Sequence, residues 1–170
     1  MVRGPISLSS AHNEWHDLFN KIKYDLESIL GGLLLKIEHI GSTSVKGLIA
    51  KPTIDIIAMI NDLDNPKLIT KLNSIDFDYI TKYEDKMPFR RYFVKRNFGS
   101  HIAHLHIFPI DHHIYKQHLI FKNILSNSEE IRSAYSKLKL KLVEKDRWDR
   151  IAYQNGKNSF ITKIIDQYSD

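Results

Sequence analysis

The sequence predicts an α+β domain in which helices flank a mixed β-sheet and the C-terminal part is helical. Three observations predict this class. Apolar residues recur at helical spacing in residues 11–30, short apolar runs alternate with polar loops in residues 33–109, and helical spacing returns after residue 112. A chain of 170 residues has the usual size of one domain with a real core, so we expect a single domain over 1–170.

The first 75 residues are predicted to form two helices and two strands. One face of the first helix is apolar, Ser9 or Ser10 can cap its start, and Gly31-Gly32 end it. A loop rich in Gly and Ser, followed by a short helical turn, separates the two strands. In order, we expect a helix at 11–30, strands at 33–40 and 53–60, a loop at 61–66 and a helix at 67–75.

The middle of the chain is expected to complete the sheet. The turn Asn97-Phe98-Gly99-Ser100 is so short that the two strands beside it must pair antiparallel. A polar loop that ends at Pro88 precedes the first strand of this hairpin. We expect strands at 77–82, 89–95 and 102–109, with the loop at 83–88.

The last third of the chain is predicted to be helical. A helix is expected from His112 to Leu125, and Asn127 with Glu130 can form a capping box for the next helix. Asp149 is expected to start a short turn before a separate final helix. The apolar positions expected to face the core in these last two helices are Ile131, Ala134, Tyr135, Leu138, Leu142, Phe160, Ile161, Ile164, Ile165 and Tyr168.

Composition narrows the classes of partner. The chain has no cysteine, which excludes disulfides and thiolate metal sites. No apolar run approaches the roughly 20 residues that span a bilayer, and the N-terminal residues lack an apolar signal core, so we expect a cytoplasmic protein. The net charge of +5 fits a Lys-rich surface, or attraction to nucleotide phosphate or nucleic acid. Because no long basic tract exists, nucleic acid is not favoured.

The candidate site begins at a loop of small residues, Gly41-Ser42-Thr43-Ser44, which lies between two apolar runs. Such a loop offers backbone N–H groups and hydroxyls to an anion. The second apolar run carries one acid, Asp55, and a carboxylate in an apolar strand costs free energy unless it is paired, bound to metal or open to a cleft. The pattern predicts a phosphate-holding turn before a metal-binding or catalytic acid. The alternatives are a helix-capping turn and a structural acid that bonds to the loop or to a histidine.

Residues 39–56, HIGSTSVKGLIAKPTIDI, resemble the signature block of the GrpB-like family, also called UPF0157. That family is grouped with the nucleotidyltransferase superfamily, so the resemblance implies this fold and nucleotide binding, without naming a substrate. The chain departs from the family at Lys46, where proline is usual, and at Phe121-Lys122-Asn123, where Phe-Arg-Asp is common. The resemblance also covers Arg90-Arg91-Tyr92-Phe93, His104-Leu105-His106, Leu119–Leu125, Tyr135, Leu138-Lys139, Tyr153, Lys157 and Phe160-Ile161.

The resemblance implies that Gly41, Ser42, Thr43 and Ser44 bind phosphates and that Asp55 binds Mg²⁺ or Mn²⁺. Superfamily members carry a second acid two residues further along, on the same face of the strand. This chain has Ile57 there, which is the main argument against ordinary two-metal transfer.

Two histidines could replace the missing acid. His104 and His106 share one face of their expected strand, so with Asp55 they could hold a metal or a phosphate, and His106 could be a catalytic base. Half-buried structural histidines are the alternative. His39 lies just before the 41–44 loop and could orient it.

Two basic residues are predicted to contact phosphate. Lys51 precedes a proline and is therefore extended, which holds its ammonium near Asp55 as an ion-pair partner or as a phosphate contact. Neighbouring arginines point to opposite faces of a strand, so at most one, Arg90, faces the site. The other basic side chains are expected at solvated surfaces: Arg91, Arg96, His101, His112, His113, His118, Lys137, Lys139 and Lys141.

These residues predict a Mg²⁺-dependent nucleotidyltransferase that moves a nucleotidyl group from an NTP to an unidentified hydroxyl or amine. The alternative is a catalytically inactive nucleotide-binding or regulatory module of the same fold, because Ile57 replaces the second acid. An acid close to Asp55, such as Glu38 or Glu84, would argue against that alternative. The expected partner is a nucleotide or another phosphorylated small molecule.

Overall fold

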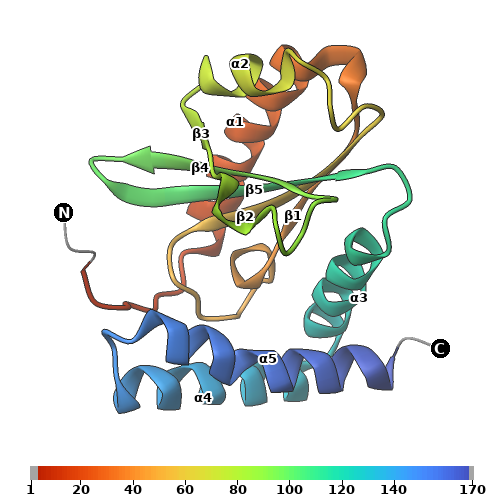
Figure 1. Ribbon diagram of the computed structural model, residues 1–170. Helices are drawn as coiled ribbons and strands as arrows, with labels where there is room; N and C mark the ends of the chain where they lie inside the picture. Colours follow the sequence, from red (N-terminus) through yellow and green to blue (C-terminus); the bar gives the residue numbers. More distant parts are fainter. Residues whose placement is uncertain (1–3, 169–170) are drawn as a thin grey trace.

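The computed structural model describes residues 4–168 as a five-stranded sheet, with α1 and α2 on one side and α3 to α5 on the other (Figure 1). None of the helices in this range is long and apolar enough to cross a membrane. The helices are α1 (His12–Leu30), α2 (Leu68–Asn73), α3 (His113–Asn127), α4 (Glu129–Lys145) and α5 (Arg150–Gln167). The strands are β1 (Leu34–Ile40), β2 (Ile54–Ile60), β3 (Phe77–Tyr79), β4 (Arg91–Asn97) and β5 (Ser100–Pro109).

The sheet is mixed, as predicted. Its strand order is β1-β2-β5-β4-β3, with β2 and β5 parallel at the centre and the other neighbours antiparallel. The predicted α+β class, a mixed sheet flanked by helices with a helical C-terminal part, is therefore confirmed. Because β2 and β5 pair in register, Asp55 lies beside His104 and Ile57 lies beside His106.

The two central strands place apolar side chains on one face and the candidate site on the other. Ile54, Ile56 and Leu105 belong to the main core, which also contains Trp15 and Leu26 of α1. Side chains alternate between the faces of a strand, so Asp55, His104 and His106 emerge on the opposite face. The predicted sidedness of the two histidines is confirmed.

Helices cover part of this second face. Tyr115 of α3 packs with Ile57 and Phe108 of the sheet. A separate apolar cluster joins Val45 and Leu48, which follow the first strand, to side chains of α3, α4 and α5. The C-terminal helices therefore pack against the segment that leads from β1 to β2, and they bring their own polar side chains to the candidate site.

Several expected boundaries were wrong because tertiary contacts decide them. Neither Ser9 nor Ser10 caps α1; Ala11 is the N-cap, and the backbone of Ser9 pairs with that of Ala50 instead. The strand predicted at 89–95 begins at Arg91, because the Arg90 N–H closes a turn onto the Met87 carbonyl.

The helical third also differs in detail. Ser128 caps α4 by accepting from the Ile131 N–H, whereas Asn127 ends α3, so the predicted capping box is wrong. Asp149 caps a continuous α5 rather than a short turn before a separate helix. Tyr168, expected in the core, follows that helix and is 55% exposed.

Candidate functional site

Gly41 sets the shape of the 41–44 loop, because both its backbone conformation and its closeness to Asp55 disfavour a side chain. Gly41 has φ +70° and ψ −173°, a region that side chains rarely tolerate. A Cβ added there would lie 2.7 Å from Oδ2 of Asp55. The N–H and the hydroxyl of Ser44 both donate to the Gly41 carbonyl, at 3.2 and 2.7 Å, and close the turn. The loop therefore lies directly against the one acid of β2.

Asp55 is an ionised carboxylate held by a histidine. Its side chain is 35% exposed, and its Oδ1 accepts from Nδ1 of His104 at 3.0 Å. Burial raises the pKa of Asp55, but the hydrogen bond and charge of His104, together with His106 and Lys157, outweigh it and lower the pKa to about 2. Asp55 is therefore negatively charged throughout the physiological range.

A second histidine extends this hydrogen-bonded chain. His101 lies at the start of β5, and its Nδ1 is 2.9 Å from Nε2 of His104. Nδ1 of His104 donates to Asp55; in a neutral His104 ring Nε2 accepts from Nδ1 of His101, and in a charged ring Nε2 donates to it. His101 was expected at the surface; the β4–β5 pairing brings it here instead. Both nitrogens of His104 are thus engaged by protein groups.

His106 is kept neutral beside Arg90. Burial lowers the pKa of His106 to about 3; the charge of Asp55 offsets part of that effect, and Arg90 makes a smaller further lowering. Nη1 of Arg90 lies 3.5 Å from Nδ1 of His106, and the Tyr92 ring stacks on the imidazole at 4.9 Å. A general base works best when its pKa is near the working pH, so this environment does not favour the predicted catalytic role of His106.

Of the two adjacent arginines, Arg90 lies beside His106 and Arg91 pairs elsewhere, although Arg90 precedes β4 and is not part of the strand as expected. Its guanidinium lies 5.2 Å from the ring centre of Tyr92 and 5.8 Å from that of Tyr83, and burial lowers its pKa. Arg91 instead pairs with Asp64 at 2.6 Å and with Glu84 at 3.8 Å. Arg91 is therefore a paired side chain rather than the solvated charge that was expected.

Lys139 is the largest departure from the sequence-based expectation. It is only 1% exposed, and its ammonium donates to Oγ of Ser42 at 3.1 Å and to the Ile49 carbonyl. The Tyr135 ring lies 4.6 Å away. Burial, and secondarily the charge of Lys157, lowers the pKa of Lys139 to about 7. The expected solvated face of α4 is wrong at this position, because the side chain of Lys139 turns inward to Ser42 and the Ile49 carbonyl. Its neighbour Leu140 is exposed.

Three further cationic or titratable side chains surround Asp55. Burial lowers the pKa of Lys157 on α5 to about 8, while the Asp55 charge raises it and Lys51 lowers it. Lys51 therefore lies within electrostatic reach of Lys157. His118, expected at a surface, has its pKa lowered by desolvation and by Arg90 and raised by Asp55. Lys157 of α5 thus faces Asp55, Lys51 lies within reach of Lys157, and Arg90 lies against His106.

Behind the loop, His39 and Thr43 form a buried support. Nε2 of His39 lies 2.9 Å from Oγ1 of Thr43, and that hydroxyl donates onward to the Thr53 carbonyl at 3.4 Å. The His39 ring stacks on Phe19 at 4.8 Å. Thr43 is buried with its hydroxyl engaged, so its side chain does not serve as the predicted phosphate contact. The predicted orienting role of His39 agrees with this geometry.

This support makes the stability of the fold sensitive to acid. Burial, aided by Lys122, lowers the pKa of His39 from 6.5 to about 4. The unfolded chain therefore binds the proton first, and stability falls as the pH drops from 6.5 to 4, by roughly 3 kcal/mol for this group. We expect His39→Gln to remove that part of the acid sensitivity. Urea unfolding of the wild type, His39→Gln and the control His16→Gln, an exposed position of α1, from pH 4 to 8 measures this effect. The same slope of unfolding free energy against pH in all three proteins would contradict the expectation.

The whole chain was compared with known proteins. Residues 5–167 match the family model described as GrpB protein. The chain belongs to the GrpB family. It is 28% identical to glutamate-rich protein GrpB of Alkalihalophilus pseudofirmus, with 97% of each chain covered. It is 29% identical to a UPF0157 protein of Halalkalibacterium halodurans, covering 94% of this chain and 80% of that one.

Solved structures agree with this assignment. GrpB of Enterococcus faecalis aligns with a TM-score of 0.83 and 30% identity, over 95% of this chain and 96% of that one. A much weaker match, with a TM-score of 0.49 and 12% identity, is to the Cid1 poly(U) polymerase bound to MgATP, over 82% of this chain and 43% of that one. Similarity at that level does not establish a shared activity.

The described residues do not form the three-ligand metal site that was predicted. Within residues 4–168 no group of three His, Cys, Asp or Glu side chains could hold a metal ion, so Asp55, His104 and His106 are not a metal triad. Of the two other acids considered, Glu38 lies opposite Ile57 and so shares a sheet face with Asp55, but its carboxylate pairs with Lys122 at 3.9 Å. Glu84 bonds to Tyr79 and pairs with Arg91. One carboxylate surrounded by cations is a poor fit for a divalent metal held by the protein alone.

Proposed function

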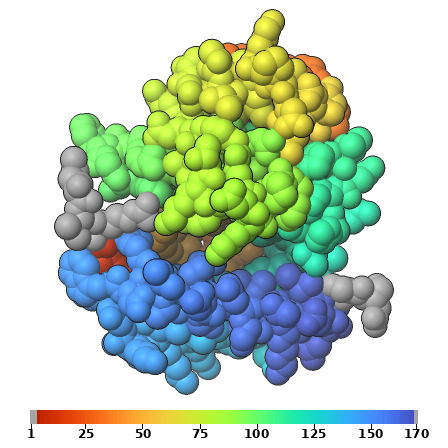
Figure 2. All heavy atoms as spheres, viewed as in Figure 1, coloured from red at the N-terminus to blue at the C-terminus, as the bar shows by residue number. Residues whose placement is uncertain are grey.

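We propose that this GrpB-family chain binds a phosphorylated small molecule, a nucleotide above all, at the 41–44 loop. The observation that carries the proposal is that the loop packs against Asp55, which Lys157 also faces, with Arg90 beside His106 on the same face of the sheet. Figure 2 shows a hollow between the segment around residue 85 and α5, and the chain leading from β1 to β2 is visible at its floor. Arg90 follows the first of these walls and Lys157 belongs to the second.

The charge balance of the site favours an anion. Lys157 faces Asp55, Lys51 is within reach of Lys157, Arg90 lies against His106, and Lys139 lies beneath the loop against Ser42. A phosphate group carries several acceptor oxygens and negative charge, so it can offset this excess of positive charge. Its binding would also favour the charged form of Lys157, whose pKa is lowered to about 8 in the free protein.

The backbone of the loop offers suitable donors. The N–H groups of Ser44 and Val45 bond to the carbonyls of Gly41 and Ser42, as in a tight helical turn. Within residues 4–168 no hydrogen bond is formed by the N–H groups of Ser42 and Thr43, which begin that turn. Two such donors beside the close approach at Gly41 suit a phosphate oxygen.

Removal of Lys157 tests this proposal directly. We expect Lys157→Met to weaken binding of a nucleotide or pyrophosphate roughly tenfold to a hundredfold, the usual worth of one charge-assisted contact. The matched control is Lys163→Met, which removes the same charge from an exposed position of the same helix. Titration calorimetry with ATP, GTP, CTP, UTP, pyrophosphate and phosphate, each in EDTA and in Mg²⁺, supplies the affinities.

The two lysine variants separate a site from general charge attraction. Loss of affinity in Lys157→Met alone supports the proposed site. Equal weakening in both variants, or the absence of binding by every phosphate compound with the wild-type protein, would contradict it. Binding of pyrophosphate as tight as that of NTPs would indicate that the phosphates, rather than the base, are recognised.

Nucleotidyl transfer is the second candidate function. It is favoured by the position of Asp55, whose Oδ2 faces the glycine of the loop. In that reaction an acceptor oxygen or nitrogen bonds to the α-phosphorus, loses its proton, and pyrophosphate leaves. Against it, Ile57 is fully buried where the second acid would be, which favours a binding or regulatory module. Pyrophosphate release from an α-³²P-labelled NTP in Mg²⁺ or Mn²⁺, with the label recovered on an acceptor rather than as NMP in wild type and neither seen in Asp55→Asn, would establish transfer.

A further inference from the structure

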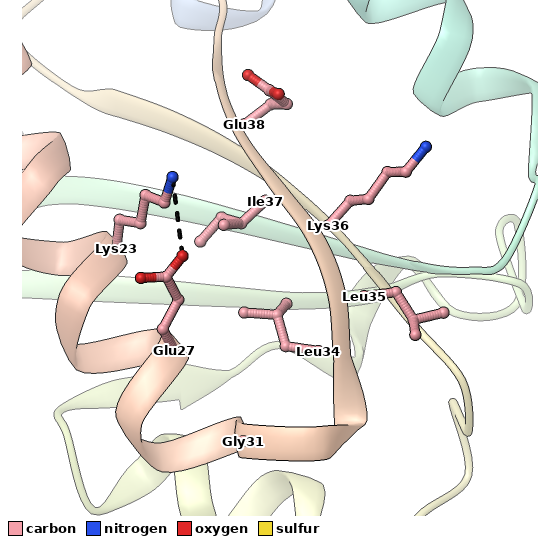
Figure 3. Close-up of a pocket in the computed structure, with 8 residues that line it drawn as sticks. All are labelled: Lys23, Glu27, Gly31, Leu34, Leu35, Lys36, Ile37 and Glu38. Atoms are coloured by element: carbon pink, nitrogen blue, oxygen red, sulfur yellow. Dashed lines mark ion pairs between the residues drawn. The ribbon is translucent and has the colours of Figure 1, made fainter.

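The outer edge of β1 is open. β1 is the first strand of the order β1-β2-β5-β4-β3, so only one of its sides is paired. Within residues 4–168 no segment other than β2 forms backbone hydrogen bonds with residues 36–40. A groove of about 330 Å³ runs between this strand and the second half of α1 (Figure 3). An unpaired edge of this kind is a template for another strand.

The edge is only partly protected against such pairing. A β-bulge between Leu34 and Lys36 interrupts the register at one end, and a lysine on an edge strand is a common protective device. From Lys36 to Ile40, however, the pairing with β2 is regular, so the backbone stays suited to a further strand. Leu35, at the groove, is 42% exposed.

The charges on this edge are complementary to themselves. Lys36 and Glu38 lie on either side of Ile37 and therefore share one face of the strand. Figure 3 shows both side chains directed away from α1. If two copies of the strand run antiparallel about a two-fold axis at Ile37, each Lys36 lies opposite Glu38 of the other copy. Opposite charges in such cross-strand pairs are stabilising, and like charges are destabilising.

We propose that β1 pairs with β1 of a second copy of this chain, antiparallel and centred on Ile37. Because of the two-fold symmetry, the contact between Lys36 of one copy and Glu38 of the other forms twice, which doubles its contribution for a short strand. The only ion pair that Glu38 makes within residues 4–168 is a long one, 3.9 Å to Lys122, and it leaves the carboxylate able to turn toward a partner. None of the residues involved belongs to the proposed phosphate site.

Charge reversal tests the pairing. Sedimentation equilibrium of the wild-type protein should show a dimer, and Lys36→Glu or Glu38→Lys alone should weaken it about tenfold or more, because each reversal places like charges opposite each other twice. Two results are specific to the proposed register. An equimolar mixture of the two single variants should form heterodimers, and the double variant Lys36→Glu/Glu38→Lys should recover the dimer.

The controls distinguish this edge from other surfaces. Lys122→Ala removes the internal ion pair of Glu38 without touching the edge, and it should leave the dimer unchanged. Circular dichroism melting of each variant confirms that it is folded. A wild-type protein that stays monomeric at high concentration would overturn the proposal, and a dimer that tolerates both single reversals would assign association to another surface and overturn it as well.

Discussion

Gly41→Ala should abolish phosphate-ligand binding and lower the free energy of unfolding by roughly 2–5 kcal/mol. Two penalties combine at this position. The backbone at φ +70° and ψ −173° is strained for any residue with a Cβ, and the new methyl group would lie 2.7 Å from Oδ2 of Asp55. The chain can relieve that contact only by moving the 41–44 loop away from β2, which takes the loop donors away from the cations.

A second glycine isolates the contribution of the contact. Gly31 also has positive φ, +52°, but a Cβ there would meet nothing within 4 Å. Gly31→Ala should therefore lose stability through backbone strain alone and keep its affinity for nucleotide. Urea unfolding and calorimetry of the three proteins give both quantities. Equal affinity in Gly41→Ala and wild type would mean that the loop takes no part in binding.

Lys139→Met should change how stability depends on pH. The folded protein holds this lysine at a pKa of about 7, below its ordinary 10.5, because the ammonium is buried. Between these two values the unfolded chain binds a proton that the folded chain does not, so wild-type stability rises with pH across this window. The rise from this group is about 5 kcal/mol. Methionine does not titrate, so the free energy of unfolding of the variant, relative to that of the wild type, should increase as the pH falls toward 7.

The same substitution should weaken ligand binding. The ammonium of Lys139 is the donor to Ser42 and to the Ile49 carbonyl, and both lose it in the variant. Lys141→Met, an exposed position of the same helix, is the matched control. Unfolding at pH 6, 8 and 10, with nucleotide affinity at pH 8, completes the comparison. If the difference in free energy of unfolding between wild type and Lys139→Met does not change with pH, Lys139 is not a buried titrating group.

Part of the site could be predicted because it is local in sequence. The Gly41-Ser42-Thr43-Ser44 loop lies between two apolar runs, and alternation along a strand assigns His104 and His106 to one face without knowledge of the fold. The short turn before His101 likewise required antiparallel pairing of β4 with β5. Helical spacing and apolar runs were sufficient for the α+β class, because each reports on a single element.

The sequence by itself determined which strands and helices form and which residue begins the site, through periodicity, small residues and one isolated acid. Only the tertiary structure decided which distant side chains meet them. Lys139, Lys157 and His101 reach the site because α4, α5 and the β4–β5 hairpin pack where they do, and a basic residue on a helix has the same local pattern whether it faces water or a buried loop. Burial then converts ordinary lysines and histidines into groups of altered pKa, a property that depends on neighbours in space and not on neighbours in the chain.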